Sequence, residues 1–346
     1  MEVIVKVLVS ALLLSALLVP AGTAAAGQPQ ATQDGVVAAA AQQLAGPPVT
    51  LHYPGSQYVI AQLLVPPGSS VEVTDATGRQ RRTYTASGWT YSVEGDTMLL
   101  TSSSARIVRT ARGFRPGEKL CGDEDFRNVT CYAKSHPWTY EHSKAVARLR
   151  MVRPEGVFVC TAWRIGEGDR MLTNNHCFST EDQAQGVEVQ FNYQCGTCDS
   201  TTVDTEQVIK VRPAGILTTR TNPDFTLYRV SDPGTIAHFG YLELATGAAD
   251  VGEPVYIPQH PAGRPKQLAI HDDQLGGNRC EIGGRSATRL HYTCDTLGGS
   301  SGSPVLSRNS HKVIALHALG ATCLGTSGGN SGYRSDQIHP LIEEYL

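Results

Sequence analysis

The stretch that decides the fold is GGSSGSP at residues 298–304, a glycine-rich turn that runs directly into the apolar Pro304-Val305-Leu306. Glycines allow backbone conformations that other residues avoid, so successive N–H groups can point into one concavity. A Gly/Ser linker would not lead straight into an apolar strand and then a second one. The stretch therefore predicts an ordered turn that presents a hydroxyl beside backbone donors.

Two other short segments supply the groups that such a hydroxyl needs. In LTNNHC, residues 172–177, a predicted strand ends at His176 beside a cysteine, and in PDFTLY, residues 223–228, Asp224 begins an alternating strand. Taken singly, such a His is usually a surface or core residue and such an Asp a turn residue. Attack on a peptide carbonyl needs a base to take the hydroxyl proton, a carboxylate to orient the base, and N–H donors for the oxyanion.

Together the three segments resemble the chymotrypsin-like serine peptidases. Their Gly-x-Ser-Gly-x-Pro turn, their His-Cys pair and their Asp-φ-x-Leu strand all have counterparts here, and the resemblance covers residues 121–346. It implies a catalytic triad of His176, Asp224 and Ser301, with the N–H groups of Gly299 and Ser301 as the oxyanion hole. It also implies an all-β fold of two packed antiparallel β-barrels with a short C-terminal helix, preceded here by a small β domain.

Two departures from the family pattern bear on mechanism and control. Asn174-Asn175 replaces an Ala-rich approach to the His, so two polar side chains need hydrogen-bond partners. Ser300 replaces the Asp that pairs with a freed N-terminus in trypsin-type zymogens. We therefore expect any zymogen control to come from the N-terminal region.

The resemblance narrows to bacterial lysyl endopeptidase, on landmarks that include VCTA (159–162), QHP (259–261) and RSDQ (334–337). It implies that Asp336 pairs with a substrate Lys and that His317 lies beside the pocket. Asp295 is the rival, because it lies six residues before Ser301, where trypsin carries its pocket Asp. Either Asp predicts cleavage after Lys or Lys/Arg.

Two alternatives stay open. The glutamyl endopeptidases share the Gly-x-Ser-Gly-Ser-Pro turn and a His on the following strand, so His317 also permits cleavage after Glu. A pseudoprotease that keeps the fold for binding is the other alternative. No cofactor is expected, and zinc is not expected because no second Cys-x-x-Cys accompanies Cys195-Gly196-Thr197-Cys198.

All nine cysteines follow residue 120, which in an exported protein indicates disulfides within one domain. Cys280 and Cys294 lie on the approach to Ser301 and could pair with each other. The family resemblance implies three further pairs, namely Cys160–Cys177, Cys131–Cys198 and Cys121–Cys323. With these four pairs, Cys195 is left over.

The first part of the chain predicts an exported protein with an extra domain. Residues 1–26 resemble a cleavable signal peptide, because the apolar run 7–19 ends before Ala24-Ala25-Ala26 and is shorter than the ~20 residues of a membrane span. Residues 27–49 predict a poorly ordered linker and residues 50–112 a small β domain, either a pro-region or a permanent accessory unit. The basic stretch Arg106–Arg115 is a candidate processing site or an exposed linker.

The peptidase domain is expected at 117–346, and the protein is expected outside the cell. A formal charge of −3 without a basic stripe argues against nucleic acid and membrane partners. The expected partners are protein or peptide substrates, with the chain's own N-terminal domain as a candidate intramolecular inhibitor or chaperone. Because the base must be neutral, activity should rise through about pH 6–7.

Overall fold

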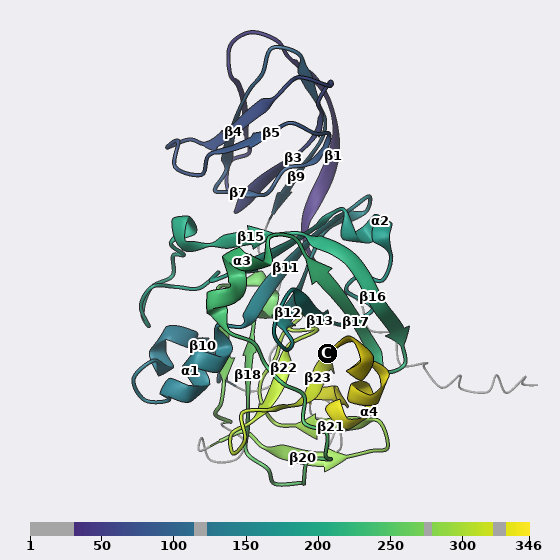
Figure 1. Cartoon of the computed structure of the whole chain (residues 1–346). Coiled ribbons are helices and arrows are strands. Elements are labelled where there is room, and N and C mark those ends of the chain that lie inside the picture. The colour runs from purple at the N-terminus through teal and green to yellow at the C-terminus, as the bar shows by residue number, and fades with distance from the viewer. Residues whose placement is uncertain (1–30, 114–122, 273–278, 321–329) are drawn as a thin grey trace, which may run out of the picture.

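The computed structural model describes residues 31–113, 123–272, 279–320 and 330–346. A small N-terminal β domain, purple to blue in Figure 1, lies at one end of the molecule, and its first strand runs down into the larger part. The strands of this domain are β1 (Thr32–Leu44), β2 (Val49–His52), β3 (Tyr58–Leu64), β4 (Val71–Asp75), β5 (Arg82–Tyr84), β6 (Gly88–Trp89), β7 (Val93–Glu94), β8 (Thr97–Thr101) and β9 (Ala105–Gly113).

Two predictions for this region are wrong. The segment 27–49 is not a linker throughout, because residues 32–44 form β1, which pairs with β9 on one side and with β12 (Gly156–Arg164) of the larger part on the other. The stretch 106–115 is not a linker either, because residues 105–113 form β9 between β1 and β3, although Arg106, Arg109 and Arg112 are exposed. In both cases the composition of the segment does not by itself predict a strand. The segment is a strand because it forms hydrogen bonds with a neighbouring strand on each side.

The larger part begins with three short elements, β10 (Arg127–Asn128), the 3-10 turn η1 (Val129–Tyr132) and helix α1 (Pro137–Ser143). A first curled sheet follows. The strands of this sheet and the elements between them are β11 (Val146–Arg153), β12, β13 (Arg170–Thr173), α2 (Glu181–Ala184), β14 (Val187–Phe191), η2 (Thr205–Gln207), β15 (Ile209–Val211), β16 (Pro213–Thr221) and β17 (Asp224–Val230). The strand order β15-β14-β11-β12 continues through β13, β17 and β16, all antiparallel, which curls the sheet into a half-barrel.

A second curled sheet follows, with strand order β10-β19-β18-β22-β23-β24-β21-β20. Its elements and the connecting turns are α3 (Pro233–Ile236), η3 (Ala237–Phe239), β18 (Val255–Gln259), η4 (Pro261–Gly263), β19 (Gln267–Ala269), β20 (Ile282–Arg285), β21 (Arg289–Tyr292), β22 (Pro304–Ser307), β23 (Val313–Leu319) and β24 (Asn330–Arg334). The chain ends in α4 (Ser335–Ile338), η5 (His339–Leu341) and η6 (Glu343–Tyr345). The fold is thus mostly β, with two barrel-like sheets and a short C-terminal helix.

The C-terminal α-helix, Ser335–Ile338, is only four residues long. Pro340 lies at the start of η5, and a proline cannot continue an α-helix because it lacks the N–H and clashes with the preceding turn. The chain therefore changes from α to 3-10 geometry after Ile338.

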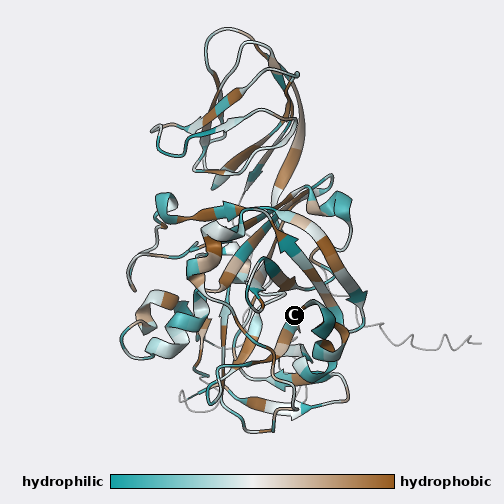
Figure 2. Ribbon diagram, in the orientation of Figure 1, coloured by the Kyte–Doolittle hydropathy of each residue, from teal (hydrophilic) through white to brown (hydrophobic). Residues whose placement is uncertain are grey.

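Each unit has its own buried core. One cluster lies within the first sheet, one within the second, and a separate one within the N-terminal domain. A fourth cluster joins the two large sheets, with members such as Trp163, Phe225 and Leu227 from the first and Tyr256, Leu306 and Leu316 from the second. Figure 2 shows hydrophobic residues along the strands, whereas the outer helix α2 is largely hydrophilic.

Three disulfides tie the larger part together. Cys160–Cys177, Cys131–Cys198 and Cys280–Cys294 are formed, as expected, and Cys195 is free and buried. The fourth expected pair, Cys121–Cys323, lies outside the described residues, as does the predicted signal peptide. Among the described helices, none combines the length and the hydropathy needed to cross a bilayer.

Candidate active site

His176 and Asp224 meet between β13 and β17. His176 lies in the turn after β13, and Asp224 is the first residue of β17, which pairs with β13. The Nδ1 atom of His176 is 2.6 Å from Oδ2 of Asp224, and the backbone N–H of His176 donates to Oδ1 at 3.1 Å. Both carboxylate oxygens are therefore used to hold one histidine. Nε2 of His176 is buried and has no hydrogen-bond partner among the described residues.

Each of the two asparagines before His176 donates a hydrogen bond through its side-chain amide, although Oδ1 of Asn174 is buried without a partner among the described residues. Asn174 is fully buried, and its Nδ2 donates to the backbone oxygen of Asp224 at 2.8 Å. Asn175 Nδ2 donates to Oγ1 of Thr219 on β16, also at 2.8 Å. These bonds fasten the histidine turn to β16 and β17, so the departure from the family pattern reinforces the placement of His176 beside Asp224.

The glycine-rich turn lies against β12 and the histidine turn. The backbone N–H of Thr161 donates to the carbonyl of Ser301 at 2.8 Å, and that same carbonyl is 3.9 Å from Cys177 Sγ. Gly302 has φ +87°, and a Cβ there would lie 2.1 Å from the carbonyl oxygen of Thr161. Glycine is therefore required at 302, because any side chain would push the turn away from β12.

Two backbone N–H groups of this turn are left free. The amides of Ser300 and Gly302 donate to Leu297 and His317, at 3.0 and 2.9 Å, whereas those of Gly299 and Ser301 donate to no group in the part of the chain that the structure describes. The carbonyl of Gly298 accepts the N–H of Ala262 at 2.5 Å. Since C=O and N–H of a trans peptide point in opposite directions, this bond fixes the N–H of Gly299 on the other side of the chain.

The buried loop at η4 supports this orientation. A Cβ at Gly299, where φ is +98°, would lie 2.7 Å from the carbonyl oxygen of His260. His260 is itself fully buried, and its Nδ1 lies 3.0 Å from the carbonyl oxygen of Arg264. The loop at η4 therefore packs against the turn and supports the orientation of its two free amides.

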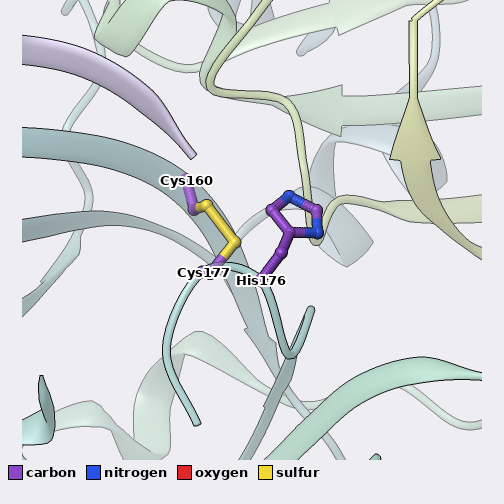
Figure 3. A group of neighbouring side chains, drawn as sticks. All are labelled: Cys160, His176 and Cys177. Atoms are coloured by element: carbon purple, nitrogen blue, oxygen red, sulfur yellow. A yellow bond between two sulfur atoms is a disulfide. The ribbon is translucent and has the colours of Figure 1, made fainter. Parts of the chain in front are cut away.

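A possible metal site at the same place is excluded by its own cysteines. Among the described residues, ligand atoms of Cys160, His176 and Cys177 lie within 4.8 Å of one another. Figure 3 shows, however, that the two sulfurs are bonded to each other. A disulfide offers no thiolate, and one imidazole does not hold a metal ion by itself.

His317 lies behind the turn, on β23, and is almost completely buried. Its Nδ1 is 2.5 Å from the hydroxyl of Tyr292 on β21. Burial, together with the charges of His176 and Arg289, lowers the pKa of His317 to about 3, so the ring is neutral at ordinary pH. Arg289 is held in turn by Tyr333, whose hydroxyl accepts from Nη2 at 2.8 Å.

The two aspartates predicted to receive a substrate cation already have partners. Asp336 forms a two-pronged ion pair with Arg334, with N–O distances of 2.9 and 2.5 Å. These hydrogen bonds lower the pKa of Asp336. Oδ2 of Asp295 accepts the backbone N–H of Asp125 at 3.1 Å. Both carboxylates therefore already accept hydrogen bonds from other groups of the chain.

Sequence reasoning missed two members of this neighbourhood. Tyr292 and Arg289 belong to β21, and their closeness to His317 follows from pairing of β21 with β24 and of β24 with β23. No short motif in the sequence marks either residue, because the strand order alone brings them to His317.

Part of the chain is similar to known peptidases. Residues 160–316 match the family model described as Trypsin-like peptidase domain. The chain is similar to Secreted RxLR effector protein 73 of Plasmopara viticola, at 35% identity over 209 residues, or 59% of this chain and 51% of that protein. It is also similar to Glutamyl endopeptidase of Bacillus licheniformis, at 28% identity over 203 residues, or 54% of this chain and 58% of that protein.

Among solved structures, a Glu endopeptidase in complex with MPD matches with a TM-score of 0.45 and 16% identity, over 66% of this chain and 98% of the other. The chain spans about half the length of the curated relatives it matches. The family model and the peptidase relative support a serine peptidase of the trypsin-like class.

Proposed function

We propose, from the trypsin-like peptidase domain matched at residues 160–316, that the chain is a secreted serine endopeptidase that uses Ser301, His176 and Asp224 and cleaves after glutamate. The observation that carries the catalytic part is the pairing of His176 with both oxygens of Asp224 beside a turn with two free amides. The three disulfides support an extracellular location, since such bonds persist in oxidising compartments.

The mechanism follows from the roles that these groups can take. Asp224 accepts the Nδ1–H of His176, which leaves Nε2 unprotonated and able to accept the proton of Ser301 Oγ. Oγ bonds to the substrate carbonyl carbon, and the oxyanion is received by the N–H groups of Gly299 and Ser301. His176 then returns the proton to the amine as the C–N bond breaks, and a water repeats the sequence to release the acid.

Specificity for glutamate is supported by the groups that lie behind the turn. His317 and Arg289 bring imidazole and guanidinium donors to one region, where the charge of Arg289 acts on His317. The Tyr292 hydroxyl lies 2.5 Å from Nδ1 of His317, and in the tautomer in which this hydroxyl donates, the ring proton is on Nε2. A substrate carboxylate would accept hydrogen bonds from these donors. A lysine ammonium can only donate, so it would find no acceptor among them.

The lysyl prediction is weakened by the same geometry. A substrate ammonium at Asp336 would have to compete with Arg334, and the two-pronged pairing of arginine with a carboxylate is one of the stronger ion pairs in proteins. We therefore prefer the glutamyl alternative to cleavage after Lys or Arg.

A peptide library digested by the full chain tests this proposal, with mass spectrometry reading the residue before each cut. We expect cuts after Glu with the wild type and with Asp336→Asn, and none with Ser301→Ala. His317→Phe keeps the volume but removes the donor, so its kcat/KM for Glu sites should fall about 10–100-fold. Cuts after Lys that disappear in Asp336→Asn would restore the lysyl prediction. No cuts and no reaction with a serine-directed probe would instead favour a binding module.

A further inference from the structure

Strand β1 reaches the catalytic turn from the N-terminal domain. It adds to the edge of β12 in antiparallel register, with Thr32 opposite Val159, Gln33 opposite Phe158 and Gly35 opposite Val157. β12 continues into Cys160, whose disulfide partner follows His176 in the chain. In Figure 3 the purple strand ends beside this disulfide, close to the imidazole of His176.

The first residue of β1 and the residue before it touch the site itself. Ala31 is 9% exposed and packs in the cluster that contains Cys160, Cys177 and Phe178. A Cβ built on Gly298 would lie 2.2 Å from Oγ1 of Thr32, so the threonine side chain rests directly on the nucleophile turn. β1 therefore occupies the space between the β12 edge and the turn that carries Ser301.

Extended peptides bind proteins by adding a strand to a free sheet edge. Here the proposed pocket for the residue before the scissile bond, at His317, lies on the β23 side of the nucleophile turn. The β12 edge lies on the other side, next to the Cys160–Cys177 disulfide. It is therefore the edge along which the residues after the scissile bond would run, and β1 already pairs with it.

The N-terminal domain holds β1 in place by polar contacts. β9 pairs with β1 along most of its length. At the junction with the larger part, Arg150 Nη1 donates to Oε1 of Glu94 at 2.9 Å, and Ser92 donates to both oxygens of Glu188 at 2.7 Å. Lys210 joins both carboxylates, at 3.4 Å from Glu94 and 3.6 Å from Glu188.

The junction combines a cavity with a small apolar cluster. The cavity, of about 730 Å³, is lined by residues that include Asp34, Tyr58, Glu94, Arg148 and Tyr193. Tyr58 and Ile60 of the N-terminal domain pack there with Val152 and Val157 of β11 and β12. This cluster is separate from the main core of each unit, so the two units can part without opening either main core.

We propose that β1 is an intramolecular occupant of the leaving-group side of the cleft. While it pairs with β12, the full chain is autoinhibited toward peptides that extend past the scissile bond, but remains open to substrates that end there. The partner that displaces β1 is an extended peptide, bound antiparallel on the β12 edge. This inference rests on the proposed peptidase activity but not on its preference for glutamate.

Two full-chain variants and two substrates test the proposal. The substrates share the residues before the scissile bond, chosen from the peptide library. One ends in a chromogenic arylamide, and the other continues for four residues with a fluorophore and a quencher. Gln33→Cys with Phe158→Cys joins a facing pair, and facing residues of antiparallel strands are about 4.5–5.5 Å apart, within disulfide range. Ala31→Asp puts a carboxylate into an apolar cluster and so disfavours docking of β1.

We expect the oxidised cysteine pair to cleave the arylamide at the wild-type rate and the extended peptide at least about tenfold more slowly than the arylamide. Ala31→Asp should raise the extended-to-short ratio at least about tenfold over the wild type. Ala39→Asp, which puts the same charge on an exposed position of β1, should leave that ratio unchanged. Equal cleavage of both substrates by the oxidised pair would overturn the inference alone. No turnover of the arylamide by any form would overturn the proposed activity, and the inference with it.

Discussion

Replacing Asp224 with Asn would preserve the shape of the site and remove the group that sets the tautomer of His176. The carboxylate now accepts two N–H groups of the same residue, at 2.6 Å from Nδ1 and 3.1 Å from the backbone. An asparagine side chain has only one acceptor oxygen. If that oxygen keeps the backbone N–H, the amide NH₂ faces Nδ1 and the ring proton moves to Nε2, where it blocks acceptance of the Ser301 proton.

The expected loss in kcat is about 10⁴, the size measured for this change in serine peptidase triads. At 1.36 kcal/mol for each factor of ten, the barrier rises by about 5 kcal/mol. Asp224 is buried, so the amide stays in the site instead of turning to solvent. The bond from Asn174 to the backbone of residue 224 is unaffected, and the fold should survive.

The assay is release of an arylamide by Asp224→Asn, with thermal unfolding to verify the fold. Asp169→Asn is the matched control, because Asp169 makes an exposed ion pair with Arg229, of a kind worth under about 1 kcal/mol. It should keep wild-type kcat. A folded Asp224→Asn variant that loses less than about tenfold in kcat would refute the assignment of Asp224 as the residue that orients His176.

Three further outcomes are expected. Gly302→Ala should abolish activity and destabilise the fold by about 1–3 kcal/mol, because the new methyl would overlap the carbonyl oxygen of Thr161, and chemical unfolding with the arylamide assay would show both. Burial lowers the pKa of Lys266 to about 7, so above this pH the folded chain has lost a proton that the unfolded chain keeps up to about pH 10.4. The free energy of unfolding should therefore rise from pH 7 to 9 by up to about 1.4 kcal/mol per pH unit from this group. Lys266→Met should remove that rise in urea unfolding. Burial alone would raise the pKa of Glu94, but Arg150 and its neighbours lower it well below the ordinary value, so Glu94→Gln should cost about 3–5 kcal/mol in unfolding and raise cleavage of the extended peptide.

The parts of the site that lie on short, self-contained segments could be predicted from the sequence. The turn around Ser301, the histidine turn and the first residues of β17 each carry their own pattern of glycine, polar and alternating apolar residues, and the structure brings the latter two together as expected. The disulfide between Cys160 and Cys177 followed from the same resemblance.

The pocket could not be predicted in the same way. RSDQ at 334–337 shows an aspartate, but not that Arg334 turns back onto Asp336 with two hydrogen bonds. Tyr292 and His317 are 25 residues apart, and only the order of β21, β24 and β23 makes them neighbours.

β1 escaped prediction for a related reason. Its VVAAAAQQL segment has no aromatic residue and only two β-branched ones, Val36 and Val37. The segment is extended because it pairs with β9, and the residues before it, from Thr32 to Gly35, pair with β12. Small side chains suit such a place, since a Cβ on Gly35 would lie 2.4 Å from the carbonyl oxygen of Arg112.

The most direct test of the central claim is covalent labelling of the full chain with a fluorophosphonate, followed by mass mapping of the modified peptide. The probe needs an activated serine and free oxyanion donors but no residues beyond the reacting atom, so β1 should not prevent the reaction. We predict one adduct, on Ser301, that is absent from Ser301→Ala and strongly slowed in His176→Ala. An unlabelled wild type, or an adduct on Ser300 or Ser303 instead, would contradict the assignment of Ser301 as the nucleophile.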